Sequence, residues 1–401
     1  MIKANKKEAI SFLGVCSIIS IWMLLITHSH THITDVDIYG HQSILLEGRL
    51  GEVTYPLWHY VTAFFYFVLH LSIEKSSSLA CACFAGLYAA VIWIYFYKTL
   101  KNAYSPFAIG LMTLVLCVVQ PLYWECFFPQ MQIGRTLTNS LINPTQNAMR
   151  PFALLTVFCA VELLYGTEEG DVWEFGERRI SKSLCLRLLM ALSALLSVLA
   201  KPSFVQVFYF TFALALLVKL VKSKGAAFKS CFLDGCSLLP SLVPFLLSFF
   251  TYFGNPSSEH SEALAISFLE IWSCYTDSVA LSILAAVAFP LAALLFLGKR
   301  AIKYRGMMLS WIMTAIGIVQ YMFIMETGDR QFDGNFSWGY QIGTNLLWVF
   351  AMEAFFKENP FARDQSKYRK VLAGAALVLI TWHFFSGFYD TYVNFGRNSF
   401  A

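Results

Sequence analysis

The chain has 401 residues, of which 57% are hydrophobic, 16% aromatic and only 13% charged, and its mean hydropathy is +0.59. Soluble domains carry roughly 25% charged residues, so the composition argues against a soluble domain, a disordered chain, a coiled coil, a disulfide scaffold and a nucleic-acid binder. The net charge of +4 says little about partners, because the basic residues lie in short loops that indicate membrane orientation.

Apolar runs of about 18 to 20 residues recur from end to end, and each is long enough to cross the hydrocarbon core of a bilayer. The chain is therefore expected to be all-α: a single integral membrane domain over residues 1–401, a polytopic bundle of about 11 to 13 transmembrane helices. The predicted spans are Ser11–Thr27, Tyr55–Ile73, Leu79–Tyr97, Pro106–Trp124, Pro151–Tyr165, Leu184–Ala200, Ser203–Val221, Leu233–Phe253, Val279–Leu297, Met307–Met325, Tyr340–Phe356 and Val371–Phe388.

Basic clusters predict how these spans are oriented, because lysine and arginine collect on the cytoplasmic side. The N-terminal lysines place the N-terminus in the cytoplasm, so the polar stretch His28–Thr54 is expected outside. Four later basic clusters are expected inside and alternate with four segments expected outside: Lys201–Pro202, Gly254–Ser278, Glu326–Gly339 and the C-terminal tail. The prediction is a multi-pass protein of the cell membrane whose C-terminus lies outside.

If all twelve predicted spans crossed the membrane, the orientations predicted for the first and second halves of the chain would disagree. Lys98 and Lys101 would then fall on the outer side, against the rule that basic residues stay inside. Either one of the first five segments is re-entrant or a crossing is missing.

The first outside loop holds an acidic pair, Asp35 and Asp37. The apolar residues of Ile38–Leu50 predict a short amphipathic helix in the membrane interface. One carboxylate can take a proton from an acceptor hydroxyl, while the other orients it or holds a divalent cation, the one cofactor left open. The alternative is a solvated loop in which an aspartate caps the helix that starts near Ile38.

A second polar stretch, Glu125–Arg150, is rich in amides and mildly cationic. Asparagines such as Asn139 and Asn143 suit sugar hydroxyls, and Arg135 or Arg150 can hold a phosphate in a bidentate fork. The sequence Asn-Pro-Thr from position 143 also starts a helix well, and the two interpretations are compatible.

Lys201 interrupts an apolar stretch that would otherwise run from Leu184 to Val218. A lysine at such a place marks a functional site unless it snorkels to the surface. A plain hairpin with a snorkelling lysine is an equally weighted alternative.

The last polar cluster covers residues 326–340 and combines charged, amide and aromatic side chains: Glu326, Asp329, Arg330, Asn335 and Trp338. Aromatic faces that stack on sugar rings beside hydrogen-bonding groups are typical of carbohydrate sites. An interfacial aromatic belt is the alternative, but a belt does not need the acidic residues and the arginine.

These motifs together resemble the GT-C superfamily of multi-span glycosyltransferases: a cytoplasmic N-terminus, an acidic pair in the first outside loop, a short interfacial helix and Tyr55-Pro56. The resemblance implies a polyprenyl-phosphate-linked sugar donor, a glycan or lipid acceptor in the cell envelope and contact with membrane lipid. It also implies Asp35 or Asp37 as catalytic base, with the donor phosphate at Lys201 or Arg135.

Two other classes stay open. A polymerase or ligase of lipid-linked polysaccharide also works through outside loops, and commonly through arginine and histidine. A transporter or flippase without chemistry would show inverted repeats and charges near the membrane midplane. The polar groups here gather in loops on one side, which favours an enzyme.

Overall fold

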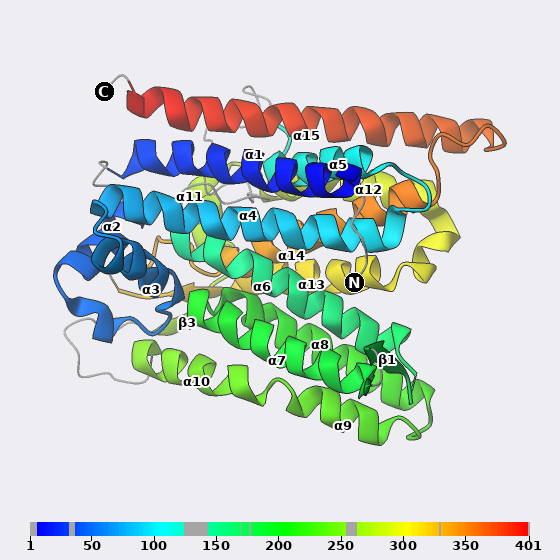
Figure 1. Cartoon of the computed structure of the whole chain (residues 1–401), viewed down its shortest axis with the longest axis horizontal. Coiled ribbons are helices and arrows are strands. Elements are labelled where there is room, and N and C mark those ends of the chain that lie inside the picture. The colour runs from blue at the N-terminus through cyan, green and yellow to red at the C-terminus, as the bar shows by residue number, and fades with distance from the viewer. Residues whose placement is uncertain are drawn as a thin grey trace.

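The computed structural model describes residues 6–31, 37–123, 143–168, 170–175, 178–253, 263–328 and 330–399. The described strands form two short antiparallel pairs, β1 (Val172–Phe175) with β2 (Arg178–Ser181) and β3 (Leu264–Ile266) with β4 (Ile324–Glu326). Almost everything else is helical, and the long helices lie side by side in a bundle (Figure 1). The predicted all-α helical bundle is confirmed.

Among the described residues, eight helices are long and apolar enough to cross a membrane, fewer than the twelve apolar runs of the sequence. They are built on α1 (Lys6–His30), α4 (Ile73–Leu100), α6 (Pro144–Val161), α7 (Lys182–Ala200), α8 (Ser203–Lys222), α12 (Val279–Leu297), α13 (Arg305–Phe323) and α15 (Lys367–Ser399). A ninth candidate is the pair α9 (Phe228–Cys236) and α10 (Leu239–Phe253), which is bent by 47°. Single turns of distorted helix, η3 (Glu162–Gly166) and η4 (Gly298–Lys303), extend α6 and α12.

The first two long helices, α1 and α4, pack antiparallel. Tyr97 near the end of α4 donates a hydrogen bond of 2.6 Å to Glu8 at the start of α1, and Ser20 donates one of 3.1 Å to the Ala82 carbonyl. The chain therefore returns directly to the end where it began. The prediction that Tyr55–Ile73 is a full crossing is wrong.

Residues 37–68 instead form short elements at one end of the bundle. The helix predicted over Ile38–Leu50 is α2 (Asp37–Leu46); Gly48 follows it at φ 71°, a left-handed conformation that glycine adopts readily. The next elements are η1 (Arg49–Glu52), α3 (Leu57–Ala63) and its π-helical extension η2 (Phe64–Val68). At about 1.5 Å per residue, these last two together reach only about 18 Å, too short to cross.

The predicted span Pro106–Trp124 is helical only over α5 (Pro106–Val118), so a full helical span is wrong here as well. Pro121 explains where the helix stops, because proline lacks an N–H and keeps the preceding residue out of the helical region. Residues 119–123 run along α15, where the Tyr123 N–H donates to the Ser386 hydroxyl at 3.0 Å.

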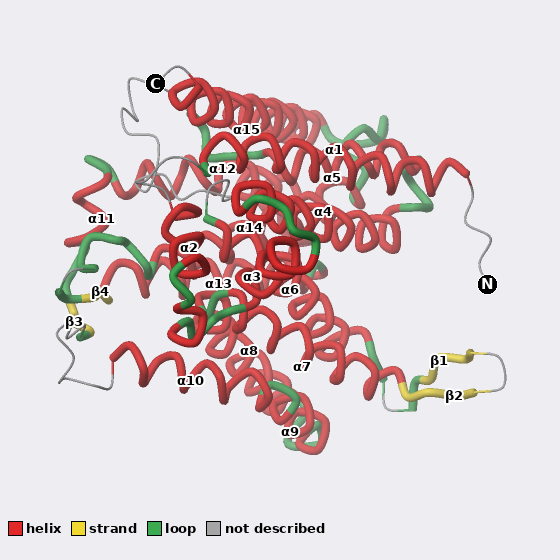
Figure 2. Tube along the Cα trace, turned by 60° about the vertical axis from the view of Figure 1, so that its left-hand side comes forward, coloured by secondary structure: helices red, strands yellow, loops and turns green. Residues whose placement is uncertain are grey.

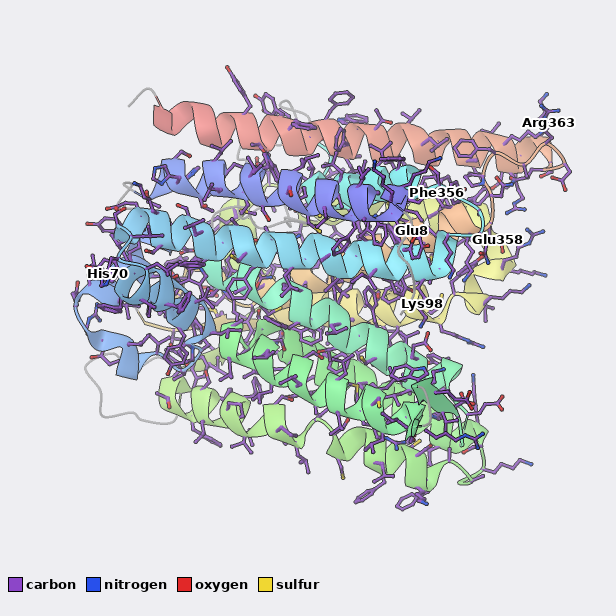
Figure 3. All side chains as sticks on the ribbon, viewed as in Figure 1. Glu8, His70, Lys98, Phe356, Glu358 and Arg363 are labelled. Atoms are coloured by element: carbon purple, nitrogen blue, oxygen red, sulfur yellow. The ribbon has the colours of Figure 1, made fainter. Side chains whose placement is uncertain are left out.

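The basic loops converge on one end of the bundle, which we call the basic end; the opposite end, which holds α2, is the α2 end. Figure 3 shows Glu8, Lys98, Glu358 and Arg363 at the basic end and His70 at the α2 end. Because residues 55–73 do not form a full span, Lys98 lies at the same end of the bundle as Glu8 at the start of α1, and the conflict in the predicted topology disappears. Gathering of lysine and arginine at one end is the pattern expected of a cytoplasmic side.

The helix α14 (Ser337–Lys357) is buried along nearly its whole length and forms the centre of the bundle. Glycines allow its neighbours to approach: a Cβ added at Gly317 of α13 would lie 2.6 Å from the Tyr340 Cα, and one at Gly339 would lie 2.9 Å from the Val207 side chain of α8. These close approaches hold the start of α14 against α8 and α13 at the α2 end. The short helix α11 (Glu270–Tyr275) packs beside α13 at the same end.

Candidate functional site

Polar side chains from four separate segments meet at the α2 end. They come from the start of α2, the start of α6, the turn between α7 and α8, and the start of α14 (Figure 2, which turns this end toward the viewer). Each of the four segments carries a residue predicted to form the site (Asp37, Asn143, Lys201 and Trp338), although they lie far apart in the sequence.

Asn143 connects these segments. It is the N-cap of α6, where its Oδ1 accepts hydrogen bonds from the Gln146 N–H at 2.8 Å and from the Thr145 hydroxyl at 3.1 Å, and Pro144 takes the first helical position. This is the helix start that Asn-Pro-Thr predicts. The Nδ2 group of Asn143 donates to Asp37 Oδ2 at 2.6 Å. The helix cap and the contact with the acidic loop therefore coexist in one side chain.

Lys201 follows α7 in an extended conformation, and α8 begins two residues later. Its Nζ donates to Asn143 Oδ1 at 3.3 Å and lies 4.2 Å from the centre of the Trp338 ring, a distance typical of a cation–π contact. Burial lowers the pKa of Lys201 from 10.5 to about 8, while the carboxylates of Asp37 and Glu326 act to raise it. The Lys201 ammonium group is therefore surrounded by protein groups: the Asn143 amide, the Trp338 ring and the carboxylates of Asp37 and Glu326.

Polar residues of the segment 326–335 form a further part of the site. Glu326 is only 8% exposed, and its Oε2 accepts a hydrogen bond of 2.6 Å from Asn335 Nδ2. Arg330 forms an ion pair with Asp333 at 3.1 Å, and its guanidinium lies 5.8 Å from the Tyr252 ring of α10. Asp37, Glu326 and Arg330 all act electrostatically on Lys201, so the start of α2 and the segment that begins at Glu326 contribute to one site.

The sequence prediction missed His41. Its Nδ1 lies 3.1 Å from His59 Nε2, and the charges of Lys201 and Arg330 act on it. Burial, His59 and these two cations lower its pKa from 6.5 to about 3. The available signal was the spacing, because residues four apart on a helix share a face, and His41 lies four residues after Asp37.

The remaining predicted residues, Asp35, Arg135, Asn139 and Asp329, lie outside the described residues. In the described ranges, no group of three or more His, Cys, Asp or Glu side chains is arranged to hold a metal ion.

Arg150 lies deeper in the bundle than this site, seven residues after Asn143 on α6. It is 4% exposed; its guanidinium lies 3.8 Å from the Tyr88 ring of α4, and Nη1 donates to Asn147 at 3.3 Å. Tyr88 in turn hydrogen-bonds Asn345 of α14. A buried cation therefore lies inside the bundle, held by aromatic and amide groups.

The fold and the site define a helical membrane protein with a charged, amide-rich site at one end of its bundle. Among protein-family models, curated proteins and solved structures, none matches the chain significantly.

Proposed function

We propose that the protein is an integral membrane glycosyltransferase. It transfers a sugar from a polyprenyl-phosphate-linked donor to a glycan or lipid acceptor of the cell envelope. The observation that carries this proposal is the row of Asp37, Asn143 and Lys201, in which one amide bridges a carboxylate and an ammonium group. The row lies at the end of the bundle opposite the basic end, and the rule that basic residues stay in the cytoplasm supports a reaction at the outer face of the membrane.

Asp37 supplies the base. The oxygen of the acceptor hydroxyl attacks the anomeric carbon, the bond from that carbon to the phosphate oxygen breaks, and Asp37 takes the hydroxyl proton. Asp37 is exposed, so an acceptor can reach its carboxylate, and the hydrogen bond from Asn143 orients it. A positioned general base typically contributes about a hundredfold to ten-thousandfold to the rate.

Lys201 supplies the charge that the departing lipid phosphate needs. Negative charge develops on the phosphate oxygens as the sugar leaves, and a fixed cation is most effective where water is excluded. The lowered pKa of Lys201 reflects such desolvation. A bound phosphate would restore to the ammonium group the electrostatic stabilisation that it lost on burial.

The short helix α3 and its extension η2 offer a surface for the lipid part of the donor. Tyr60, Phe64, Phe67 and Val68 are each about half exposed or more, at 57%, 49%, 60% and 60%. Their spacing places them on one helical face, while Trp58 and the other buried residues face the bundle. The charges of Asp37 and Arg330 act on Tyr55, two residues before α3, so this apolar face begins close to the charged row.

One observation favours a second function, a transporter or flippase without chemistry. Arg150 is a buried cation about 10 Å further into the bundle than Asn143, if α6 rises about 1.5 Å per residue. Charged residues inside membrane helices commonly mark the path of a polar substrate.

The experiment is a transfer assay with the full-length protein in lipid vesicles that contain extracted membrane lipid. Radiolabelled sugars linked to polyprenyl phosphate are the donors, and the label is followed into new glycan or lipid products. We expect transfer by the wild type and a loss of about a hundredfold or more in Asp37→Asn, the scale of a general base. The matched control is Glu47→Gln, which changes an exposed carboxylate one residue after α2.

Equal transfer by Asp37→Asn and Glu47→Gln would remove Asp37 as base. Movement of intact donor across the vesicle membrane without any new glycosidic product would establish the transporter function instead. Products extended by many sugar units would identify a polymerase.

A further inference from the structure

His41 and Asp37 lie on the same side of α2. They are four residues apart on one helix, so their side chains project in similar directions. Lys201 acts electrostatically on both of them. The helix therefore presents a carboxylate and an imidazole to the same ammonium group.

A second histidine determines which nitrogen of His41 carries a proton. His41 Nδ1 and His59 Nε2 lie 3.1 Å apart, so one of the two nitrogens donates and the other accepts. His59 is fully buried, and its Nδ1 has no hydrogen-bond partner in the described part of the chain. A buried N–H without an acceptor is rarer in proteins than an unsatisfied acceptor. The proton of His59 is therefore on Nε2, which donates to His41 Nδ1.

The proton of His41 is then on Nε2. A neutral imidazole carries a single N–H, and its other nitrogen accepts. The ring is neutral at pH 7 because burial, His59, Lys201 and Arg330 hold its pKa far below that value. His41 thus offers the site one N–H donor and adds no charge to the two cations that already act on it.

We propose that His41 is a ligand of phosphate, donating its Nε2–H to a phosphate oxygen that is also bound by Lys201 and Arg330, with His59 as the residue that fixes this tautomer. The assignment of the phosphate to a lipid-linked donor rests on the proposed function, but phosphate binding itself does not. Asp333 pairs with Arg330, and Asp37 and Glu326 act on Lys201. These three carboxylates already interact with Lys201 and Arg330. Because His41 is neutral, its hydrogen bond to phosphate does not require an ion pair of the protein to break.

The test measures binding by calorimetry with the full-length protein in nanodiscs. Inorganic phosphate and polyprenyl phosphate are titrated in separate arms, because the same headgroup chemistry can come from either source. Glutamine places an amide N–H near the position of the imidazole Nε2, whereas asparagine places one near Nδ1. His41→Gln should bind within about threefold of the wild type, and His41→Asn should bind at least about tenfold more weakly, the scale of a hydrogen bond to a charged group.

His59 is tested in the same way. His59→Gln keeps an N–H donor for His41 Nδ1 and should retain binding, whereas His59→Leu leaves the tautomer unfixed and should weaken it severalfold. His70→Asn is the matched control: His70 is exposed at the α2 end, and its φ of 52° is a conformation that asparagine tolerates. Thermal unfolding of each variant identifies any that fail to fold.

Equal binding by His41→Asn and the wild type, or an equal loss in His41→Gln and His41→Asn, would overturn the proposal, as would a wild type that binds neither probe. Binding in the polyprenyl arm alone assigns the site to a lipid headgroup. A protein that binds phosphate through His41 but never transfers sugar leaves this inference standing while the proposed function fails. If the protein transfers sugar but binds phosphate equally well without His41, the proposed function stands and this inference fails.

Discussion

The amide of Asn143 and the carboxylate of Asp37 are joined by a hydrogen bond of 2.6 Å, although 106 residues separate them in the chain. The same amide accepts a hydrogen bond from Lys201 at 3.3 Å. Asn143 is also the N-cap of α6. One side chain therefore starts a helix and holds together the two charged groups of the candidate site.

These two roles of Asn143 can be separated by substitution. Asn143→Ser keeps a good N-cap but cannot bridge Asp37 and Lys201, whereas Asn143→Ala loses both functions and about 1 kcal/mol of stability. We expect Asn143→Ser to unfold at the temperature of the wild type and to transfer sugar at least about tenfold more slowly, mainly through kcat, because the base is no longer oriented. Thermal unfolding and steady-state kinetics measure the two effects, and wild-type kcat in Asn143→Ser would contradict the bridging role.

Lys201 should make phosphate binding fall at alkaline pH. Its pKa is lowered from 10.5 to about 8, so the ammonium fraction drops as the pH rises through about 8 and the attraction for an anion is lost. Phosphate should bind at least about fivefold more weakly near pH 9.5 than near pH 7.5, allowing for an upward shift of the pKa by the bound anion. Lys201→Arg, which does not lose its proton in this range, should remove the dependence; an equal decline in both proteins would assign it to another group.

The lowered pKa of Lys201 should weaken phosphate binding at alkaline pH but increase the free energy of unfolding. Above about pH 8 the unfolded chain binds a proton at residue 201 that the folded protein has released, so this residue makes the folded state more stable as the pH rises from about 8 to about 10.5. Unfolding of the wild type and of Lys201→Met across this range should differ in slope.

The proposed orientation places the α2 end outside and the basic end in the cytoplasm. Cys274 of α11 is exposed at the α2 end, so a protein with this cysteine alone should react with an impermeant maleimide from outside in intact cells. A single cysteine at Lys224, in the turn after α8, should react only after the membrane is opened. The reverse pattern would move the whole charged row to the cytoplasmic side.

Asp234 should stabilise the basic end. It is 1% exposed, accepts a hydrogen bond of 2.8 Å from Arg187 of α7 and lies 3.8 Å from Lys219 of α8. Asp234→Leu leaves two cations without their buried partner and should cost about 3 kcal/mol or more. Arg187→Leu in the same chain should recover part of that loss, because the pair is then removed together. Thermal unfolding in detergent measures both, with phosphate binding at the distant α2 end as the unchanged control.

The amino-acid sequence by itself determined the local features of this protein. Apolar runs of sufficient length predicted eight candidate spans correctly because helix length and hydropathy are properties of contiguous residues. The start of α6 at Asn143-Pro144 was readable for the same reason, since a cap needs only its own side chain and the next few N–H groups. The common side of Lys98 and the N-terminal lysines did not follow from the sequence, because it depends on the number of crossings between them, which the apolar runs overestimated.

Only the tertiary structure decided which apolar runs do not form full-length spans and which polar residues meet. Residues 55–73 are as apolar as a span, and their failure to cross follows from the antiparallel packing of α1 on α4, which involves partners such as Glu8 and Tyr97 far apart in the sequence. Asp37, Asn143 and Lys201 belong to three different helix starts or turns; His41 shares α2 with Asp37, and His59 lies on α3. Hydrophobic periodicity places each side chain on its own helix, whereas the distances between helices depend on packing, which no single segment contains.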